Sequence, residues 1–112
     1  MKKKKILTFT ATYNEAENIK KLIYKIKKYN PNIHILIIDD NSPDGTGKII
    51  QKMSNNIKNL KLITRTAKKG LDSAHKLAYK FALKNNYDYL ITMDADFSHD
   101  PRVIKNFLKF LP

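Results

Sequence analysis

Ile33-His34-Ile35-Leu36-Ile37-Ile38-Asp39-Asp40 is an almost unbroken aliphatic run that ends in two acids. A run this short and this apolar is typical of a β-strand that is buried on both faces, as the strands of a parallel sheet are. Helices must then cover both faces of the sheet, which predicts the α/β fold class.

Apolar, β-rich runs alternate with amphipathic helical patterns on both sides of this strand. Such alternation predicts a single α/β domain over residues 1–112, with a mainly parallel sheet and right-handed crossovers. Asp100 and Pro101 fit the cap and first position of a fourth helix. The predicted strands are 5–10, 33–39, 60–64 and 89–94, and the other predicted helices are 14–29, 46–55 and 71–85. The third helix is expected to bury Leu71, Ala74, Leu77, Ala78, Phe81 and Ala82.

The composition narrows the class of protein. With 42% hydrophobic and 29% charged residues, the chain fits a soluble globular domain. It contains no cysteine, which excludes disulfides and zinc–thiolate sites and favours a cytoplasmic location. The apolar stretch 6–11 is too short for a signal peptide, although it follows Lys2-Lys3-Lys4-Lys5, and no run approaches the ~20 residues of a membrane span.

The chain is strongly basic, with a formal net charge of +12. Such a charge favours an anionic partner: a nucleic acid, an acidic membrane surface or a phosphorylated substrate. Peripheral contact of Lys2 to Lys5 with an anionic membrane is one expectation. Lysines that only solvate helix surfaces are the alternative, and the abundance of Lys, Asn and Ile favours it.

The acidic residues follow a different pattern. Nine of the ten fall between the end of a predicted strand and the first turn of the next helix, which is one edge of a parallel sheet. Helix dipoles and caps explain several of them. They do not explain the pairs Asp39/Asp40 and Asp94/Asp96 at strand ends, because neighbouring carboxylates repel unless cations or hydrogen-bond donors compensate them.

Asp94 and Asp96 are the predicted metal ligands and catalytic residues. Residues i and i+2 of an extended segment point to the same side, so both carboxylates can face one point while Ala95 turns away. Carboxylate oxygens suit Mg²⁺ or Mn²⁺, which complete their coordination with water and substrate phosphates. The sequence therefore predicts an Mg²⁺ or Mn²⁺ site that binds a nucleotide diphosphate.

Other functional classes fit less well. Gly45-Thr46-Gly47-Lys48 lacks the earlier glycine of a phosphate-binding loop, since Ser42 stands there, and Gly45 is better explained as a turn residue. A nucleotidyltransferase would need a glycine-rich loop after the first strand. A nucleic-acid protein would need a basic, aromatic-lined face, and no nucleic-acid partner is expected. A receiver-like domain would place its acids after the first and third strands.

Four segments resemble family-2 glycosyltransferases of the GT-A fold, in particular the dolichol-phosphate (polyprenol-phosphate) mannose synthase group. They are TYNEAENI (12–19), IIDDNSPDGT (37–46), KKGLDSAHKLAYKFA (68–82) and YLITMDADFSHDP (89–101). The resemblance implies transfer of a sugar, with GDP-mannose favoured as donor, to a polyprenyl phosphate. Departure of the nucleoside diphosphate would be metal-assisted.

The resemblance also implies roles for individual residues. Asp94 and Asp96 match the metal-binding DxD motif, and Ser98 follows where a polar side chain contacts the site. Asp39 matches the carboxylate that binds the base or ribose. The remaining residues that match nucleotide-binding positions are Thr12, Tyr13, Glu15, Lys69 and Gly70.

The chain departs from the family pattern in two ways. Ala11 replaces a usual proline, and Asp72 and Ala78 replace common glycines, which leaves the donor open. Family members also continue beyond the fourth helix, so a truncated chain, completed by a missing C-terminal half or a partner chain, is expected. In the family's sheet order the fourth strand would be an exposed edge. The alternatives are a nucleotide-sugar-binding fragment without turnover, and an enzyme with a UDP-sugar donor and another acceptor.

Overall fold

The computed structural model describes residues 4–66, 70–95 and 101–102, and within them strands and helices alternate. The elements are β1 (Ile6–Thr12), α1 (Ile19–Tyr29), β2 (His34–Asp39), α2 (Thr46–Ser54), β3 (Leu60–Thr64), α3 (Leu71–Lys84) and β4 (Tyr89–Thr92). The strands pair in the order β3-β2-β1-β4, and all three pairings are parallel. The predicted α/β class and parallel sheet are confirmed. The fourth predicted helix lies almost wholly outside the described residues.

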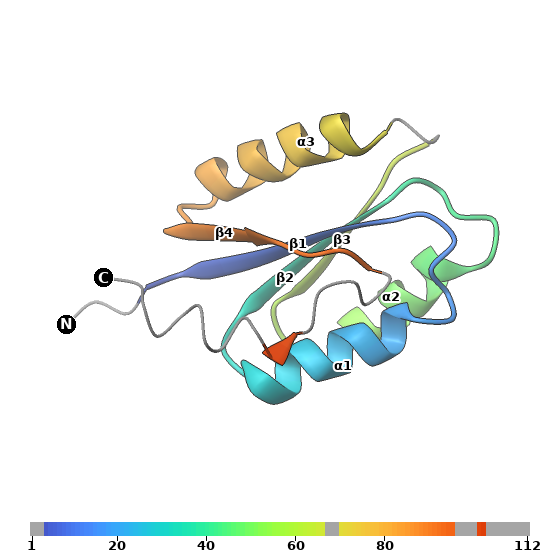
Figure 1. Ribbon diagram of the computed structural model, residues 1–112, viewed down its shortest axis with the longest axis horizontal. Helices are drawn as coiled ribbons and strands as arrows, with labels where there is room; N and C mark the ends of the chain where they lie inside the picture. Colours follow the sequence, from blue (N-terminus) through green and yellow to red (C-terminus); the bar gives the residue numbers. More distant parts are fainter. Residues whose placement is uncertain (1–3, 67–69, 96–100, 103–112) are drawn as a thin grey trace.

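Helices cover both faces of the sheet, with α1 and α2 on one side and α3 on the other (Figure 1). Successive side chains of β2 point to opposite faces of the sheet, so each face needs a layer of helices to cover it. Ile35 and Ile37 belong to the core beside α1 and α2, whereas Leu36 and Ile38 belong to the core beneath α3. All four are fully buried. The prediction that this run is a strand buried on both faces is confirmed.

The two helical layers pack differently. α1 buries large aliphatic residues, Ile19, Leu22, Ile23 and Ile26, at the spacing of one helix face. α3 instead meets the sheet through Ala74, Ala78 and Ala82, and Leu77 and Phe81 pack at the side of this ridge. The prediction that Leu71 is buried is wrong: it is 57% exposed, because it begins the helix one turn before the alanine ridge makes contact.

Some element boundaries differ from those predicted. α1 begins at Ile19 rather than near Asn14, because Asn14 has a left-handed backbone (φ 56°) and the N–H groups of residues 14–16 bond to another loop. β1 extends to Thr12, where it pairs with Asp39 of β2. β4 ends at Thr92 and has only β1 as a partner within the described residues, so it forms an edge as expected. In the described part of the chain, no helix is long and apolar enough to cross a membrane.

We predict that Ile37→Ala lowers the free energy of unfolding by about 2–5 kcal/mol, because the removed methyl groups leave a cavity between the sheet and α1. Leu83→Ala is the control, since Leu83 is 79% exposed, and it should change stability by less than about 0.5 kcal/mol. Urea unfolding followed by circular dichroism measures both. Equal effects would contradict the two-sided burial of β2.

Candidate functional site

The polar residues gather at the edge where the parallel strands end. The strand register places Thr12, Asp39 and Thr64 in line across β1, β2 and β3. Asp94 follows shortly after the end of β4 on the same edge. The parallel sheet thus brings together segments that are far apart in the sequence, as the distribution of acids predicted.

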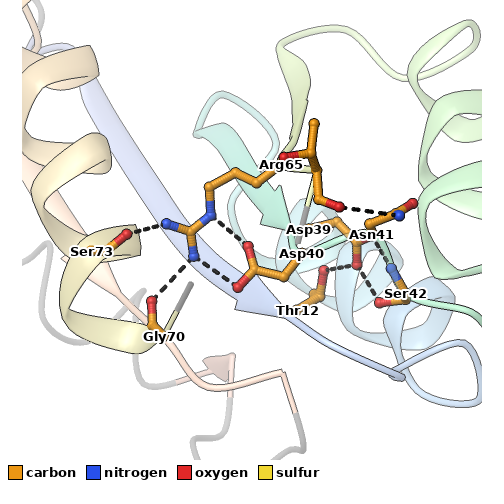
Figure 2. A network of polar contacts seen from close by, with 9 residues as sticks. Thr12, Asp39, Asp40, Asn41, Ser42, Arg65, Gly70 and Ser73 are labelled. Atoms are coloured by element: carbon orange, nitrogen blue, oxygen red, sulfur yellow. Dashed lines mark hydrogen bonds and ion pairs between the residues drawn. The ribbon is translucent and has the colours of Figure 1, made fainter. Parts of the chain in front are cut away.

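Asp39 turns toward the side of the sheet that α1 and α2 cover, and it is 1% exposed. Its Oδ1 accepts hydrogen bonds from the Thr12 hydroxyl at 2.6 Å and the Ser42 hydroxyl at 2.7 Å. Its Oδ2 accepts one from the Ser42 backbone N–H at 3.0 Å (Figure 2). Three donors from the protein therefore stabilise this buried carboxylate and fix the start of the loop after β2.

Asp40 turns to the opposite face, because successive residues of an extended chain alternate. There it meets Arg65, which follows β3. The guanidinium binds both carboxylate oxygens, with Nε 2.5 Å from Oδ1 and Nη2 2.8 Å from Oδ2. Arg65 also donates to the Ser73 hydroxyl and, at 3.1 Å, to the Gly70 carbonyl oxygen (Figure 2). One side chain thus joins the ends of β2 and β3 to the start of α3.

The loop after β1 is tied to the loop after β2. Three successive backbone N–H groups of the first loop donate to side-chain oxygens of the second: Asn14 to Ser42 at 2.9 Å, Glu15 to Thr46 at 3.0 Å and Ala16 to Asp44 at 3.0 Å. These bonds replace the first helical turn that the sequence pattern predicted. Gly45 has φ 89°, which confirms it as the turn residue before α2.

Asp44 holds this second loop together. Its Oδ1 accepts the N–H and the hydroxyl of Thr46, and its Oδ2 accepts the N–H of Ala16. Desolvation raises the pKa of the Asp44 carboxyl, but the hydrogen bonds from Thr46 and Ala16 outweigh it and hold the pKa below its ordinary value. The ionised form of Asp44 is therefore the one that the folded loop favours.

The predicted site residues have different surroundings. Thr12 and Asp39 are buried and bonded to each other, whereas Tyr13 is 39% exposed just beyond β1. Glu15 is half-buried, and its carbonyl oxygen accepts the N–H groups of Asn18 and Ile19 before α1. Gly70 precedes α3 with φ 89°. Lys69, Asp96 and Ser98 lie outside the described residues.

Asp94 lies where a metal ligand was predicted. Its neighbours Met93 and Ala95 are buried in the core beside α1, and Asp94 itself is exposed. This alternation is the one on which the predicted pairing of Asp94 with Asp96 depends. Within the part of the chain that is described, no group of three or more metal-ligating side chains occurs. The carboxylate of Asp94 fits a hard divalent cation that takes its other ligands from a substrate.

A hollow of about 340 Å³ lies beside Asp39. It is lined by the loop after β2, the first turns of α2 and, from β3, Leu62 and Thr64. This volume is near the lower end of the range that holds small ligands.

Three residues that organise this edge were not predicted: Thr46, Arg65 and Ser73. Thr46 and Ser73 carry no sequence signal that separates them from other hydroxyl residues. Arg65 does, because it is one of two arginines in a chain with 22 basic residues and it directly follows a strand. An arginine retained among lysines favours a bidentate contact with a carboxylate, which lysine cannot make.

We predict that Arg65→Gln lowers the free energy of unfolding by about 3–5 kcal/mol, because it removes the cation that faces a buried carboxylate. Adding Asp40→Asn should recover part of that loss, with a coupling of about 0.5–3 kcal/mol in a double-mutant cycle. The control is Lys61→Gln, which removes an exposed charge from β3, the strand that Arg65 follows. Additive effects of the Arg65 and Asp40 substitutions would show that the pair is not coupled.

The lowered pKa of Asp44 predicts an acid-dependent loss of stability. A carboxyl whose folded pKa lies below its unfolded value of 3.8 stabilises the fold above that value. This contribution disappears as the pH falls through the folded pKa. Asp44→Asn should therefore flatten the dependence of unfolding free energy on pH below about 4, as measured by urea titrations at several pH values. If the unfolding free energies of the wild type and Asp44→Asn depended on pH in the same way, the lowered pKa of Asp44 would be refuted.

Comparisons with known proteins agree with this architecture. The family model of glycosyl transferase family 2 matches residues 8–112. Polyprenol monophosphomannose synthase of Mycolicibacterium smegmatis is 35% identical over 103 residues, covering 91% of this chain and 39% of the relative. Undecaprenyl-phosphate mannosyltransferase of Micrococcus luteus is 33% identical over 105 residues, covering 94% of this chain and 43% of the relative.

Two further comparisons concern another relative and a solved structure. Dolichol-phosphate mannosyltransferase of Pyrococcus furiosus is 36% identical over 107 residues, covering 94% of this chain and 29% of the relative. The chain thus spans less than half the length of each of these three relatives. Among solved structures, a mannosyltransferase of Pyrobaculum calidifontis in complex with GDP-Man and Mn²⁺ has a TM-score of 0.63 at 23% identity, covering 70% of this chain and 24% of its own. This likeness confirms the GT-A-type fold. Because the family model matches nearly the whole chain, the chain belongs to glycosyl transferase family 2.

Proposed function

We propose that this chain forms the donor-binding part of a glycosyltransferase that moves mannose from GDP-mannose to a polyprenyl phosphate. The observation that carries the proposal is the carboxyl edge of the sheet. There the exposed carboxylate of Asp94 lies at the same edge as loops that Asp39, Asp40 and Arg65 hold in place. The names of the relatives support mannose as the sugar and a polyprenyl phosphate as the acceptor.

The nucleoside would lie against the loop after β1. Tyr13 offers an exposed aromatic ring there, and Glu15 and Gly70 lie on loops tied to the same network. Thr12 and Asp39 would lie at the base of this nucleoside site. For Asp39 to contact the base or ribose directly, an oxygen would have to exchange a bond from Ser42 for one from the ligand. By their positions in the family motif, we assign Lys69 to the phosphates and Ser98 to a polar contact with the site.

Asp94 and Asp96 would hold the divalent cation. A bound Mg²⁺ or Mn²⁺ neutralises the charge that develops on a departing nucleoside diphosphate. The Mn²⁺ reported for the solved mannosyltransferase supports this choice of ion. The task of the protein is to present carboxylate oxygens from a rigid strand end, and the buried neighbours of Asp94 provide that rigidity.

The acceptor would attack the anomeric carbon in line and invert it. A polyprenyl phosphate is already an anion near neutral pH, so its oxygen needs no general base to become a nucleophile. A hydroxyl acceptor would need one. A polyprenyl chain also partitions into a bilayer, and for this reason we infer that the protein works in the cytoplasm, peripherally, at an anionic membrane surface.

The binding experiment is calorimetric titration of GDP, GDP-mannose and UDP-glucose, each with Mn²⁺ and with a chelator. We expect metal-dependent binding of GDP-mannose, weakened about tenfold or more, equivalent to at least ~1.4 kcal/mol, by Asp94→Asn. Asp88→Asn is the matched control, because Asp88 is an exposed acid that precedes β4 at the opposite edge of the sheet. It should bind as the wild type does.

The outcomes separate the candidate functions. Tighter binding of UDP-glucose than of GDP-mannose would show that the donor is a UDP-sugar. Binding without mannosyl transfer to polyprenyl phosphate would identify a nucleotide-sugar-binding unit that has no turnover alone, which the short span relative to its relatives makes a specific alternative. Absence of binding by a folded chain would contradict the proposed donor site.

A further inference from the structure

The opposite edge of the sheet, where the strands begin, is basic. Lys4 and Lys5 precede β1, and Lys58 precedes β3. Lys27 reaches this edge from α1, where its ammonium donates to the Ile33 carbonyl oxygen at 2.5 Å. The sequence places only one acid before a strand, Asp88, and its carboxylate accepts the backbone N–H of Lys5 at 2.7 Å. Positive charge therefore accumulates at the edge remote from the candidate nucleotide site.

Lys4 and Lys5 line a hollow of about 310 Å³ at this edge, and Lys27 and Lys58 lie near His34, which also lines it. Among the described residues that line it, none is acidic, and five carry side-chain N–H donors. The lining consists of Lys4, Lys5, Ile6, Asn32, His34 and Asn59. An open hollow lined by two ammonium groups, an imidazole and two amides has the chemistry to receive an oxyanion.

Two of the lining side chains, Lys5 and His34, contact Tyr87. The Nδ1 atom of His34 is 2.7 Å from the Tyr87 hydroxyl, and the two rings meet edge to face. The Lys5 ammonium lies 4.3 Å from the centre of the Tyr87 ring and donates to the Asn85 carbonyl oxygen at 2.6 Å. Lys5 and His34 therefore keep their places beside the hollow without any bound ligand, which makes the donors preorganised.

Helix ends explain only part of this arrangement. Cations are stabilised near helix C-termini, and the contact of Lys5 with the Asn85 carbonyl oxygen at the end of α3 is of that kind. Lys27 instead bonds to Ile33, which lies between α1 and β2. Lys4 and Lys58 have exposed side chains, and His34 lies among like charges. Burial, and then the charges of Lys5, Lys27 and Lys58, lower the pKa of His34. Burial and the surrounding lysines therefore disfavour the protonation of His34 until a bound anion compensates the positive charge.

We propose that this basic hollow, defined by Lys4, Lys5, His34 and Asn59, binds a phosphate group at a site separate from the nucleotide edge. The phosphate belongs either to a soluble molecule or to a lipid headgroup, since both offer the same oxygens. This site does not depend on the proposed donor chemistry, because it shares none of the residues assigned to that function.

Phosphate binding and the charge of His34 are then linked. An anion in the hollow favours the imidazolium form, so the pKa of His34 rises on binding. By the same linkage, binding strengthens as the pH falls through the titration of His34. The groups that face His34 are Tyr87 and three lysines, Lys5, Lys27 and Lys58. Asp88 is close to Lys5 and moderates the field, but it does not line the hollow.

The experiment follows the ring resonances of His34 by NMR during titration with sulfate, whose charge is constant near neutral pH, and with inorganic phosphate. We expect both anions to raise the pKa of His34. Lys4→Gln/Lys58→Gln should weaken binding about threefold to tenfold, as expected for two exposed charges. The matched control is Lys20→Gln/Lys52→Gln, which removes equal charge from a hollow between α1 and α2.

A second arm uses vesicles of phosphatidylcholine with and without phosphatidylglycerol. Binding of inorganic phosphate assigns the site to a soluble phosphate, whereas binding to phosphatidylglycerol vesicles alone, lost in Lys4→Gln/Lys58→Gln, assigns it to a headgroup. Equal weakening in the two double variants would overturn the proposal. So would an unchanged His34 pKa with sulfate and phosphate together with no binding to phosphatidylglycerol vesicles. Asp94→Asn should leave this binding intact, so a failure of the donor-site proposal is distinguishable.

Discussion

The folded structure depends on how β2 ends. Its aliphatic residues are buried on both faces, and the chain then leaves the sheet with two successive carboxylates that are still buried. Buried charges without partners would cost several kcal/mol each. Asp39 is matched by Thr12 and Ser42 on one face, and Asp40 by Arg65 on the other. The hydrogen bonds and the ion pair that compensate these two buried carboxylates also fix the loops after β1, β2 and β3.

The same requirement explains which parts of the structure the sequence could predict. Two-sided burial of 33–39, the order of strands and helices and the bounds of β3 depend on local apolar periodicity, and they were predicted correctly. The start of α1 at Ile19 depends on bonds from Asn14, Glu15 and Ala16 to a loop about 30 residues away, which no local pattern encodes. The prediction that Leu71 is buried was wrong for a related reason, because periodicity does not show where a helix first touches the sheet.

The candidate site was predictable in its location more than in its contacts. Acids at strand ends predicted that carboxylates gather at one edge of the sheet, and the structure places Asp39 and Asp94 there. Their roles as nucleotide and metal ligands stay predictions. Arg65 was missed because its importance arises from a partner on a neighbouring strand and from the start of α3. A platform cross-linked in this way suits a transferase, because the groups that hold a donor must keep their geometry while charge moves through the substrate.

The segregation of charge between the two edges of the sheet has a consequence for how the molecule approaches its surroundings. Among the described residues, acids at the carboxyl edge and lysines at the amino edge separate charge along the strands, in addition to the net charge of +12 of the whole sequence. Charge alone would therefore turn the amino edge toward a polyanionic surface. Transfer to a membrane-borne polyprenyl phosphate needs the carboxyl edge within reach of that surface, so the proposed function requires contacts that oppose this orientation.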